Sequence, residues 1–231
     1  MQGQVVLVTG ASGGIGRAIC LELLAAGADV VLLGRSEARL RAAVSHAGDQ
    51  RAELLEADLT DAAAVQKVGL RIAQRGRLDA LVLSSGIYER SDHLEMFRLQ
   101  MAANVLGPYT LIQTLLPILL QCQGQIVFIN SSQALRAAAT VSQYAATMHA
   151  MKALADSLRD EVNDRGIRIM TLYVGRTAGE RQRRIFEFEG RSYSPERLIQ
   201  PSDLARMVVY LLQMPKTVEV TDLIMRPMKK N

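Results

Sequence analysis

The chain has 231 residues, of which 49% are hydrophobic and 22% charged, so its composition is globular and excludes wholesale disorder. Two cysteines exclude a disulfide framework, and three scattered histidines lack the spacing of zinc ligands, so we expect no metal. The net charge is +4, but aromatic residues do not interleave with the arginines, which argues against nucleic acid as a partner.

Continuous apolar runs alternate along the chain with segments of helical periodicity. The runs predicted as strands are Val5–Val8, Asp29–Leu33, Ala52–Glu56, Leu78–Leu83, Gln125–Asn130, Arg168–Val174 and Val218–Met225. The segments predicted as helices are Ile15–Ala26, Ser36–Ala47, Asp61–Gln74, Met96–Leu120, Tyr144–Asn163 and Ser202–Met214. Strands without polar alternation, separated by such helices, predict an α/β fold with a doubly wound parallel sheet of about seven strands and helices on both faces. The charged stretch Ala178–Gln200 has little periodicity, and we expect an irregular functional loop there.

Two parts of the sequence bear on the cellular location of the protein, namely the start of the chain and its longest apolar stretch. Met1 is followed almost at once by the strand-like run Val5–Val8, with no leader segment visible. The stretch Val105–Leu120 is broken by two prolines, a glycine and a glutamine, and is too short to span a bilayer. We therefore expect a soluble, cytoplasmic protein with no membrane partner.

The segment between the first strand and the first helix is rich in glycine and reads Thr9-Gly10-Ala11-Ser12-Gly13-Gly14-Ile15-Gly16. Glycines let the chain turn tightly and let a phosphate group approach the backbone, whose free N–H groups and helix dipole then face the anion. Because a strand precedes this segment and a helix follows it, the pattern predicts a dinucleotide-binding loop rather than an ordinary turn.

With further motifs, this loop makes the chain similar to the short-chain dehydrogenase/reductase family over nearly its whole length. Asp58-Leu59-Thr60 resembles that family's adenine-contacting segment, Leu81–Ile87 its fourth strand and turn, and Val174–Thr177 the turn that touches the nicotinamide. The resemblance implies one Rossmann-fold domain over residues 1–231. It also implies a nicotinamide cofactor held by Gly10, Ser12, Gly13, Gly14, Ile15, Gly16, Arg35, Ser36, Asp58, Leu59, Ser85, Gly86, Tyr144 and Thr177.

The end of the second predicted strand bears on which nicotinamide cofactor is used. Family members that use NAD usually carry an acidic residue there, whereas this chain has Gly34 followed by Arg35. A carboxylate would repel a 2′-phosphate, but arginine can bind one in a fork, and Ser12 and Ser36 could add hydroxyl donors. We therefore expect NADP(H) in preference to NAD(H).

The resemblance also assigns catalytic roles, and one of them lacks its usual residue. Tyr144 would exchange a proton with the substrate oxygen, Ser131 would hold that oxygen, and Asn104 would support a water chain. The family's lysine, four residues after the tyrosine, lowers the tyrosine pKa electrostatically, but here the position holds Met148. Because free tyrosine titrates near 10 and methionine carries no charge, we expect a less acidic tyrosine and an interrupted proton relay.

Other residues near the predicted active site bear on whether the missing lysine is replaced and on how far the site departs from the family pattern. Lys152 lies two helical turns beyond Tyr144 and about 80° round the helix, which favours a surface role over replacement of the lysine. The turn after the fourth strand reads Leu83-Ser84-Ser85-Gly86 where the family has Asn-Asn-Ala-Gly, a bulky Asn130 precedes Ser131, and Val174 replaces a proline. The arginines Arg181, Arg183 and Arg184 form either a solvated helix face or a surface that attracts an acidic substrate or carrier.

Three functions therefore stay open. The first is an NADP(H)-dependent oxidoreductase that interconverts a carbonyl and an alcohol on a small-molecule substrate, acidic or carrier-bound substrates being one class. The second is a non-redox isomerase, dehydratase or cyclase that uses Ser131 and Tyr144. The third is a catalytically silent binding or regulatory subunit, in which Ser131 is a strand-end cap and Tyr144 a core residue. The family's long helices, here Met96–Leu120 and Tyr144–Asn163, imply a homodimer or homotetramer.

Overall fold

Runs of valine, leucine and isoleucine form seven strands at the centre of the fold, and all neighbouring strands pair in parallel. The computed structural model describes residues 1–45 and 50–229. The strands, placed in the order β3-β2-β1-β4-β5-β6-β7, are β1 (Val5–Thr9), β2 (Asp29–Gly34), β3 (Ala52–Glu56), β4 (Ala80–Leu83), β5 (Gln125–Ser131), β6 (Arg168–Val174) and β7 (Asp222–Met225). The predicted doubly wound sheet is thereby confirmed.

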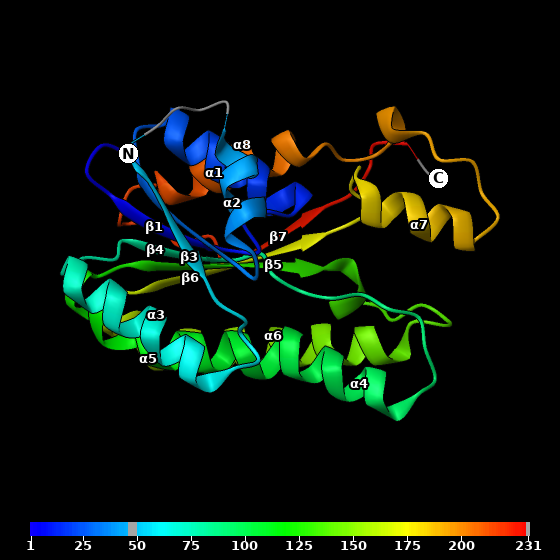
Figure 1. Ribbon diagram of the computed structural model, residues 1–231, viewed down its shortest axis with the longest axis horizontal. Coiled ribbons are helices and arrows are strands. Elements are labelled where there is room, and N and C mark those ends of the chain that lie inside the picture. Colours follow the sequence, from blue (N-terminus) through cyan, green and yellow to red (C-terminus); the bar gives the residue numbers. More distant parts are fainter. Residues whose placement is uncertain (46–49, 230–231) are drawn as a thin grey trace.

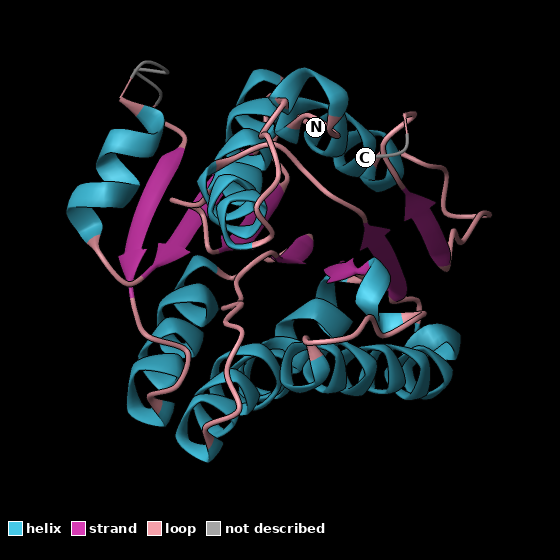
Figure 2. Cartoon of the chain, turned by 90° about the vertical axis from the view of Figure 1, so that its right-hand side faces the viewer, coloured by secondary structure: helices cyan, strands magenta, loops and turns pink. Residues whose placement is uncertain are grey.

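Helices cover both faces of this sheet (Figures 1 and 2). One face carries α1 (Gly14–Ala25), α2 (Glu37–Val44) and α8 (Pro201–Leu212), and the other carries α3 (Ala62–Arg75), α5 (Gly107–Cys122) and α6 (Ser142–Val162). Since successive side chains of a strand point to opposite faces, β1 supplies Val6 and Val8 to the first layer and Leu7 to the second. The inner strands β1, β2, β4, β5 and β6 are therefore buried on both sides, which explains their lack of polar alternation.

Two of the predicted elements differ from the structure. The stretch Ala178–Gln200 is not irregular throughout, because α7 (Glu180–Phe188) forms within it. Its buried face consists of Gln182 and Phe186, four residues apart, and the surrounding charges obscure that spacing in the sequence. The long helix predicted over Met96–Leu120 consists of α4 (Leu94–Met101), a π-helical turn (Ala102–Leu106) and α5.

Smaller differences affect element boundaries. The fourth strand begins at Ala80 instead of Leu78, and the seventh begins at Asp222 instead of Val218. The second helix is described as far as Val44, and its predicted end at Ala47 lies outside the described residues.

The helical stretch Leu94–Cys122 is long and apolar enough to cross a membrane by length and composition. Within the fold, however, α5 places Leu111, Leu115 and Leu119 in the core against the sheet, fully buried. A buried core helix passes the same test, so we assign α5 to the core.

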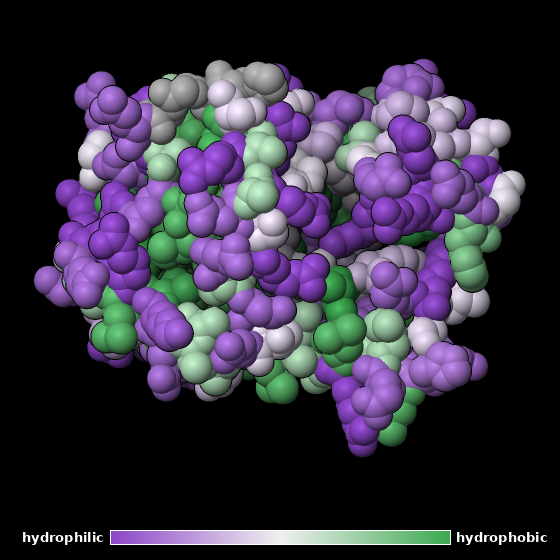
Figure 3. Space-filling model, viewed as in Figure 1, coloured by the Kyte–Doolittle hydropathy of each residue, from purple (hydrophilic) through white to green (hydrophobic). Residues whose placement is uncertain are grey.

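The order of the strands fixes where a ligand can bind. Strand β1 lies between β2 and β4 in the sheet. The chain adds β2 and β3 on one side of β1 and then continues with β4 on the other side, so the strand order reverses at β1. Ligands of such sheets bind in the crevice outside the carboxyl ends of the strands, at the point where the order reverses. Here that crevice is formed by the loops after β1, β4, β5 and β6. Figure 3 shows the surface hollowed beside α7 at this edge.

Candidate active site

The glycine-rich loop after β1 packs directly on the loop after β4. Gly10 has a φ of +63°, and a Cβ on it would lie 2.8 Å from the Ser85 Cα. A Cβ on Gly16 would lie 2.3 Å from the Gly10 carbonyl oxygen, whereas one on Gly14 would meet nothing within 4 Å. Helix α1, which begins here, has no side-chain cap and no acidic residue in its first turn. This open, uncapped helix end suits the pyrophosphate of a dinucleotide, as the sequence predicts.

Thr9 fixes the relation between these two loops. Its hydroxyl accepts the N–H groups of Ser84 and Ser85, both at 3.0 Å, and donates to the Ser85 hydroxyl at 3.0 Å. Three hydrogen bonds to one side chain therefore place Ser85 and the neighbouring Gly86 beside the glycine loop. The serines that replace the family's asparagine and alanine thus take part in shaping the crevice.

Residues expected at the adenosine end gather at the ends of β2 and β3. A Cβ on Gly34 would lie 3.7 Å from the Ser12 hydroxyl, so Ser12 is brought next to the start of the exposed Arg35. Ser36 caps α2 by accepting the Arg39 N–H at 3.4 Å. Asp58 accepts the N–H and hydroxyl of Thr60 through one oxygen, at 2.9 and 2.8 Å, with the half-buried Leu59 between them.

Ser131 and Tyr144 come together as the spacing suggests. Ser131 ends β5, Tyr144 lies in the first turn of α6, and their hydroxyl groups are hydrogen bonded. Burial raises the pKa of Tyr144 above its ordinary range, while the positive charge of Arg181 and the hydrogen bond with Ser131 oppose the rise. The Ser131 hydroxyl also accepts the Gln133 N–H at 3.2 Å, so it caps the strand end as well as contacting the tyrosine.

Asn104 holds two parts of the site together. It is 2% exposed and lies in the π-helical turn, a type of distortion that is frequent at functional sites. Its carbonyl accepts the Ile87 N–H at 2.7 Å, and its amide donates to the Ile87 carbonyl at 2.9 Å and to the Thr147 hydroxyl at 3.1 Å. The side chain therefore connects the loop after β4 to α6, next to Met148.

Met148 occupies an apolar position, 8% exposed, and packs against Tyr173, with Tyr144 beside them. Its carbonyl oxygen accepts the Asn130 amide at 3.1 Å, and the Asn130 carbonyl accepts the Ser131 N–H at 2.7 Å. Asn130, which the sequence marked only as bulky, thus ties the end of β5 to α6.

The structure does not bring Lys152 to this position. Its ammonium group pairs with Asp156 at 2.5 Å, one turn further along α6. Thr177, expected near the nicotinamide, lies just after β6 and donates to the Gly175 carbonyl at 3.1 Å.

A group of ion pairs that the sequence did not reveal fastens α7 over the crevice. Glu189, just after α7, accepts Arg90 from the loop after β4 at 2.6 Å and Arg176 from the end of β6 at 2.8 Å. The Arg176 guanidinium also lies 4.8 Å from the centre of the Phe186 ring. Burial alone would raise the pKa of Glu189, but the hydrogen bonds from Arg176 and Arg90 outweigh it and lower the pKa. Arg90 is 99 residues from Glu189 in the sequence and Arg176 is 13 residues from it, so neither pair has the spacing of neighbours on one helix and no local pattern predicts them.

Replacing Glu189 with glutamine is expected to loosen α7. Both arginines would lose a partly buried partner, which favours local opening about tenfold. Hydrogen–deuterium exchange over residues 180–189 should therefore accelerate, while exchange in β1 and β5 stays unchanged. The exposed Glu187→Gln is the matched control.

The same ion pairs have a defined pH dependence. Because the folded-state pKa of Glu189 is lowered, its contribution is complete above the ordinary value of about 4.3 and is lost as the pH falls through the folded pKa. Equal hydrogen–deuterium exchange over residues 180–189 in Glu189→Gln and Glu187→Gln would contradict the role of these ion pairs in holding α7.

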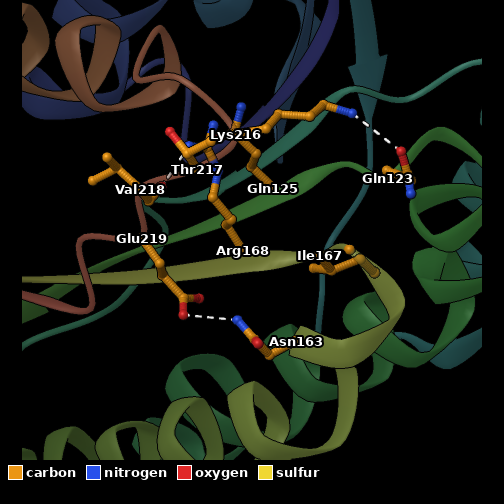
Figure 4. Close-up of a pocket in the computed structure, with 10 residues that line it drawn as sticks. Gln123, Gln125, Asn163, Ile167, Arg168, Lys216, Thr217, Val218 and Glu219 are labelled. Atoms are coloured by element: carbon orange, nitrogen blue, oxygen red, sulfur yellow. Dashed lines mark hydrogen bonds between the residues drawn. The ribbon is translucent and has the colours of Figure 1, made fainter.

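A second hollow, of about 540 Å³, lies at the opposite edge of the sheet (Figure 4). Arg168 there donates to three backbone carbonyls between Met214 and Val218, at 2.8–3.1 Å, and Glu219 accepts the Asn163 amide at 2.8 Å. These groups are satisfied by the end of α8 and the segment before β7, so the hollow is a structural junction. Within the described residues, no three His, Cys, Asp or Glu side chains are grouped to hold a metal ion.

Comparison with known proteins gives consistent matches. A family model described as short chain dehydrogenase matches residues 4–190. Dehydrogenase/reductase SDR family member 7B of Danio rerio is 33% identical over 189 residues, which is 76% of this chain, and the chain spans 61% of that relative's length. A fatty acyl-CoA reductase of Acinetobacter baylyi is 32% identical over 232 residues, covering 94% of this chain and 76% of the relative. The structure of a metagenomic short-chain oxidoreductase in complex with NADP is 27% identical, covers 99% of both chains and has a TM-score of 0.84.

Proposed function

Because the chain belongs to the short-chain dehydrogenase family, we propose that it is an NADP(H)-dependent oxidoreductase that interconverts a carbonyl and an alcohol. The observation that carries this proposal is the hydrogen-bonded pair Ser131–Tyr144, which stands at the same sheet edge as the open glycine cradle. A proton donor and a dinucleotide site in one crevice are the two requirements of carbonyl reduction.

In this proposal each residue has a limited task. A bound nicotinamide supplies the hydride in reduction and accepts it in oxidation. The loop Gly10–Gly16 would hold the pyrophosphate, and Ser85, Gly86 and Thr177 would line the site of the nicotinamide end. Ser131 donates a hydrogen bond to the substrate oxygen, Tyr144 gives that oxygen its proton, and Asn104 acts as a positioning residue for the loop after β4.

Met148 affects the direction in which the enzyme works best. With a raised pKa, Tyr144 is protonated at neutral pH, which is the form required of an acid in carbonyl reduction. Alcohol oxidation needs the deprotonated form, so its rate rises with pH up to that pKa. We therefore propose that the enzyme acts as a reductase at neutral pH.

Replacing Arg35 with glutamine tests the preference for NADP(H). A charge-assisted hydrogen bond to a 2′-phosphate is worth about 1.5–3 kcal/mol, so the Kd for NADPH should rise about tenfold to a hundredfold. The Kd for NADH, which lacks this phosphate, should stay unchanged. Arg41→Gln is the control, since Arg41 is 71% exposed and pairs with Glu37. Equal affinity of the unmodified protein for NADPH and NADH would contradict the preference.

The substrate and assembly are further parts of the proposal. An acidic or carrier-bound carbonyl compound is supported by Arg181 at the crevice and by the name of the fatty acyl-CoA reductase relative. Assembly as a homodimer or homotetramer is supported by exposed apolar side chains on α4, the π-helical turn and α5, namely Leu94, Leu99, Leu106 and Tyr109. We also propose a cytoplasmic location.

The decisive experiment follows NADPH consumption by the purified protein with a panel of aldehydes, ketones and β-ketoacyl thioesters. Stoichiometric formation of alcohol and NADP is expected. Turnover of a substrate without any nicotinamide would instead support an isomerase, dehydratase or cyclase that uses the same pair. An inert homomer that co-purifies with a related chain would support a silent subunit.

A further inference from the structure

The missing lysine leaves the buried side of Tyr144 without a cation. Met148 fills that side together with Tyr173, and Lys152 is committed to its ion pair with Asp156. Among the residues that the structure describes, no basic side chain takes the lysine's place below the ring. A phenolate formed there would face methionine and aromatic carbon, which is unfavourable for a charged group.

The opposite side of the site does contain a cation. Arg181, in the first turn of α7, reaches across the crevice and donates through Nη2 to the Gly86 carbonyl at 2.5 Å. Two residues beyond Gly86, the Tyr88 ring packs edge-on against Tyr144, with ring centres 4.8 Å apart. The guanidinium thus binds the loop whose Tyr88 ring contacts the tyrosine.

Arg181 also differs from the arginines beside it. Arg183 and Arg184 both lie within 4.0 Å of the Glu180 carboxylate. Arg181 has no carboxylate within that distance in the described part of the chain, so its charge is not neutralised by an acidic partner. It is therefore the member of the cluster whose charge acts on the crevice.

The groups that act on Tyr144 come from three elements. Arg181 on α7 and the hydrogen bond from Ser131 on β5 lower the pKa of Tyr144, and Tyr88 in the loop after β4 raises it. The Tyr88 hydroxyl in turn accepts the Arg90 Nε–H at 2.7 Å. Arg181 is the only positive charge in this set.

We propose that Arg181 takes over the electrostatic task of the missing lysine by stabilising the tyrosinate that forms when Tyr144 gives up its proton. This inference rests on the proposed function. In reduction, the Tyr144 O–H bond breaks as the substrate oxygen gains the proton, while the carbonyl carbon gains a hydride from reduced nicotinamide. The phenolate recovers a proton from solvent. Arg181 contacts the loop after β4 rather than a reacting atom in this structure, so we class it as a positioning residue.

The test is a spectroscopic titration of the ligand-free protein, which needs no turnover. The chain has six tyrosines, and subtracting the tyrosinate absorbance of Tyr144→Phe isolates Tyr144. In Arg181→Gln the Tyr144 midpoint is expected to rise by about one pH unit. Arg181→Lys keeps a charge and should restore most of the shift. Arg184→Gln, 74% exposed on the same helix, should titrate like the unmodified protein.

A second variant separates charge from shape. Adding Met148→Lys to Arg181→Gln places a cation on the other side of the ring, and the midpoint should return to or below its original value. Coincident titration curves for Arg181→Gln, Arg184→Gln and the unmodified protein would overturn the inference, whatever the fate of Met148→Lys. If the unmodified protein reduced no carbonyl compound with NADPH, the proposed function would fail even where the titration of Tyr144 still depended on Arg181, and the two failures are therefore distinguishable.

Discussion

Replacing Tyr144 with phenylalanine is expected to lower kcat/KM for carbonyl reduction by about 10²–10⁴-fold, the usual contribution of a positioned acid. The variant loses one oxygen atom and keeps the ring that packs edge-on against Tyr88. The melting temperature and the Kd for NADPH should therefore change little. Steady-state kinetics with NADPH, together with a binding titration, would measure both effects.

The rates of reduction and oxidation should depend on pH in opposite directions if Tyr144 exchanges the proton. Because burial raises the Tyr144 pKa, reduction in the unmodified protein should be nearly constant at neutral pH and fall as the pH rises through that pKa. Oxidation should rise over the same interval. Tyr144→Phe should lose both trends, while Tyr210→Phe, 61% exposed on α8, should keep them. A Tyr144→Phe enzyme with unchanged kcat/KM would exclude Tyr144 as the acid.

The sheet was predictable because its inner strands are buried on both faces. Val6, Val8 and Leu7 in one short run satisfy two hydrophobic layers, and a continuous apolar run of this length has few other stable placements. The glycine loop was predictable for a related reason, since a backbone contact such as that of Gly10 with Ser85 admits no side chain. Both signals are local in the sequence.

Helix α7 shows why other parts were missed. Its apolar face is narrow, with Phe186 as its large buried side chain, and the ion pairs of Glu189 with Arg90 and Arg176 fix it from outside. Such contacts join segments distant in the sequence, so only the folded chain reveals them. Local periodicity is a weak guide for an element that tertiary contacts hold in place.

Part of the catalytic site could likewise be predicted from the sequence, and part is revealed only by the folded chain. The family resemblance, applied to the positions of Ser131, Tyr144 and Met148, predicted both the pair and the absent charge. The candidate replacement, Arg181, is 37 residues beyond Tyr144 and is brought into the crevice because α7 folds back over the loop after β4, where Arg181 binds the Gly86 carbonyl. A departure from a family pattern can be read from the sequence, whereas its compensation depends on the tertiary structure.

Two alanine substitutions in the glycine loop should separate folding from cofactor binding. In Gly16→Ala the new Cβ would lie 2.3 Å from the Gly10 carbonyl oxygen, a backbone atom that cannot turn aside. Overpacking of this kind costs about 3 kcal/mol at the upper end of its usual range. For a chain of this size, that corresponds to a melting temperature lower by about 6–12 °C. Thermal unfolding followed by circular dichroism would measure it.

Gly14→Ala is the matched partner, because its Cβ would meet no atom within 4 Å. Its melting temperature should stay close to that of the unmodified protein. The added methyl group would nevertheless stand at the uncapped start of α1, where the pyrophosphate is proposed to approach the N–H groups. Losing one charge-assisted hydrogen bond there would raise the Kd for NADPH about tenfold or more. If Gly14→Ala bound NADPH with unchanged affinity, the open space at Gly14 would not be the cofactor cradle, and the dinucleotide would have to bind elsewhere in the crevice.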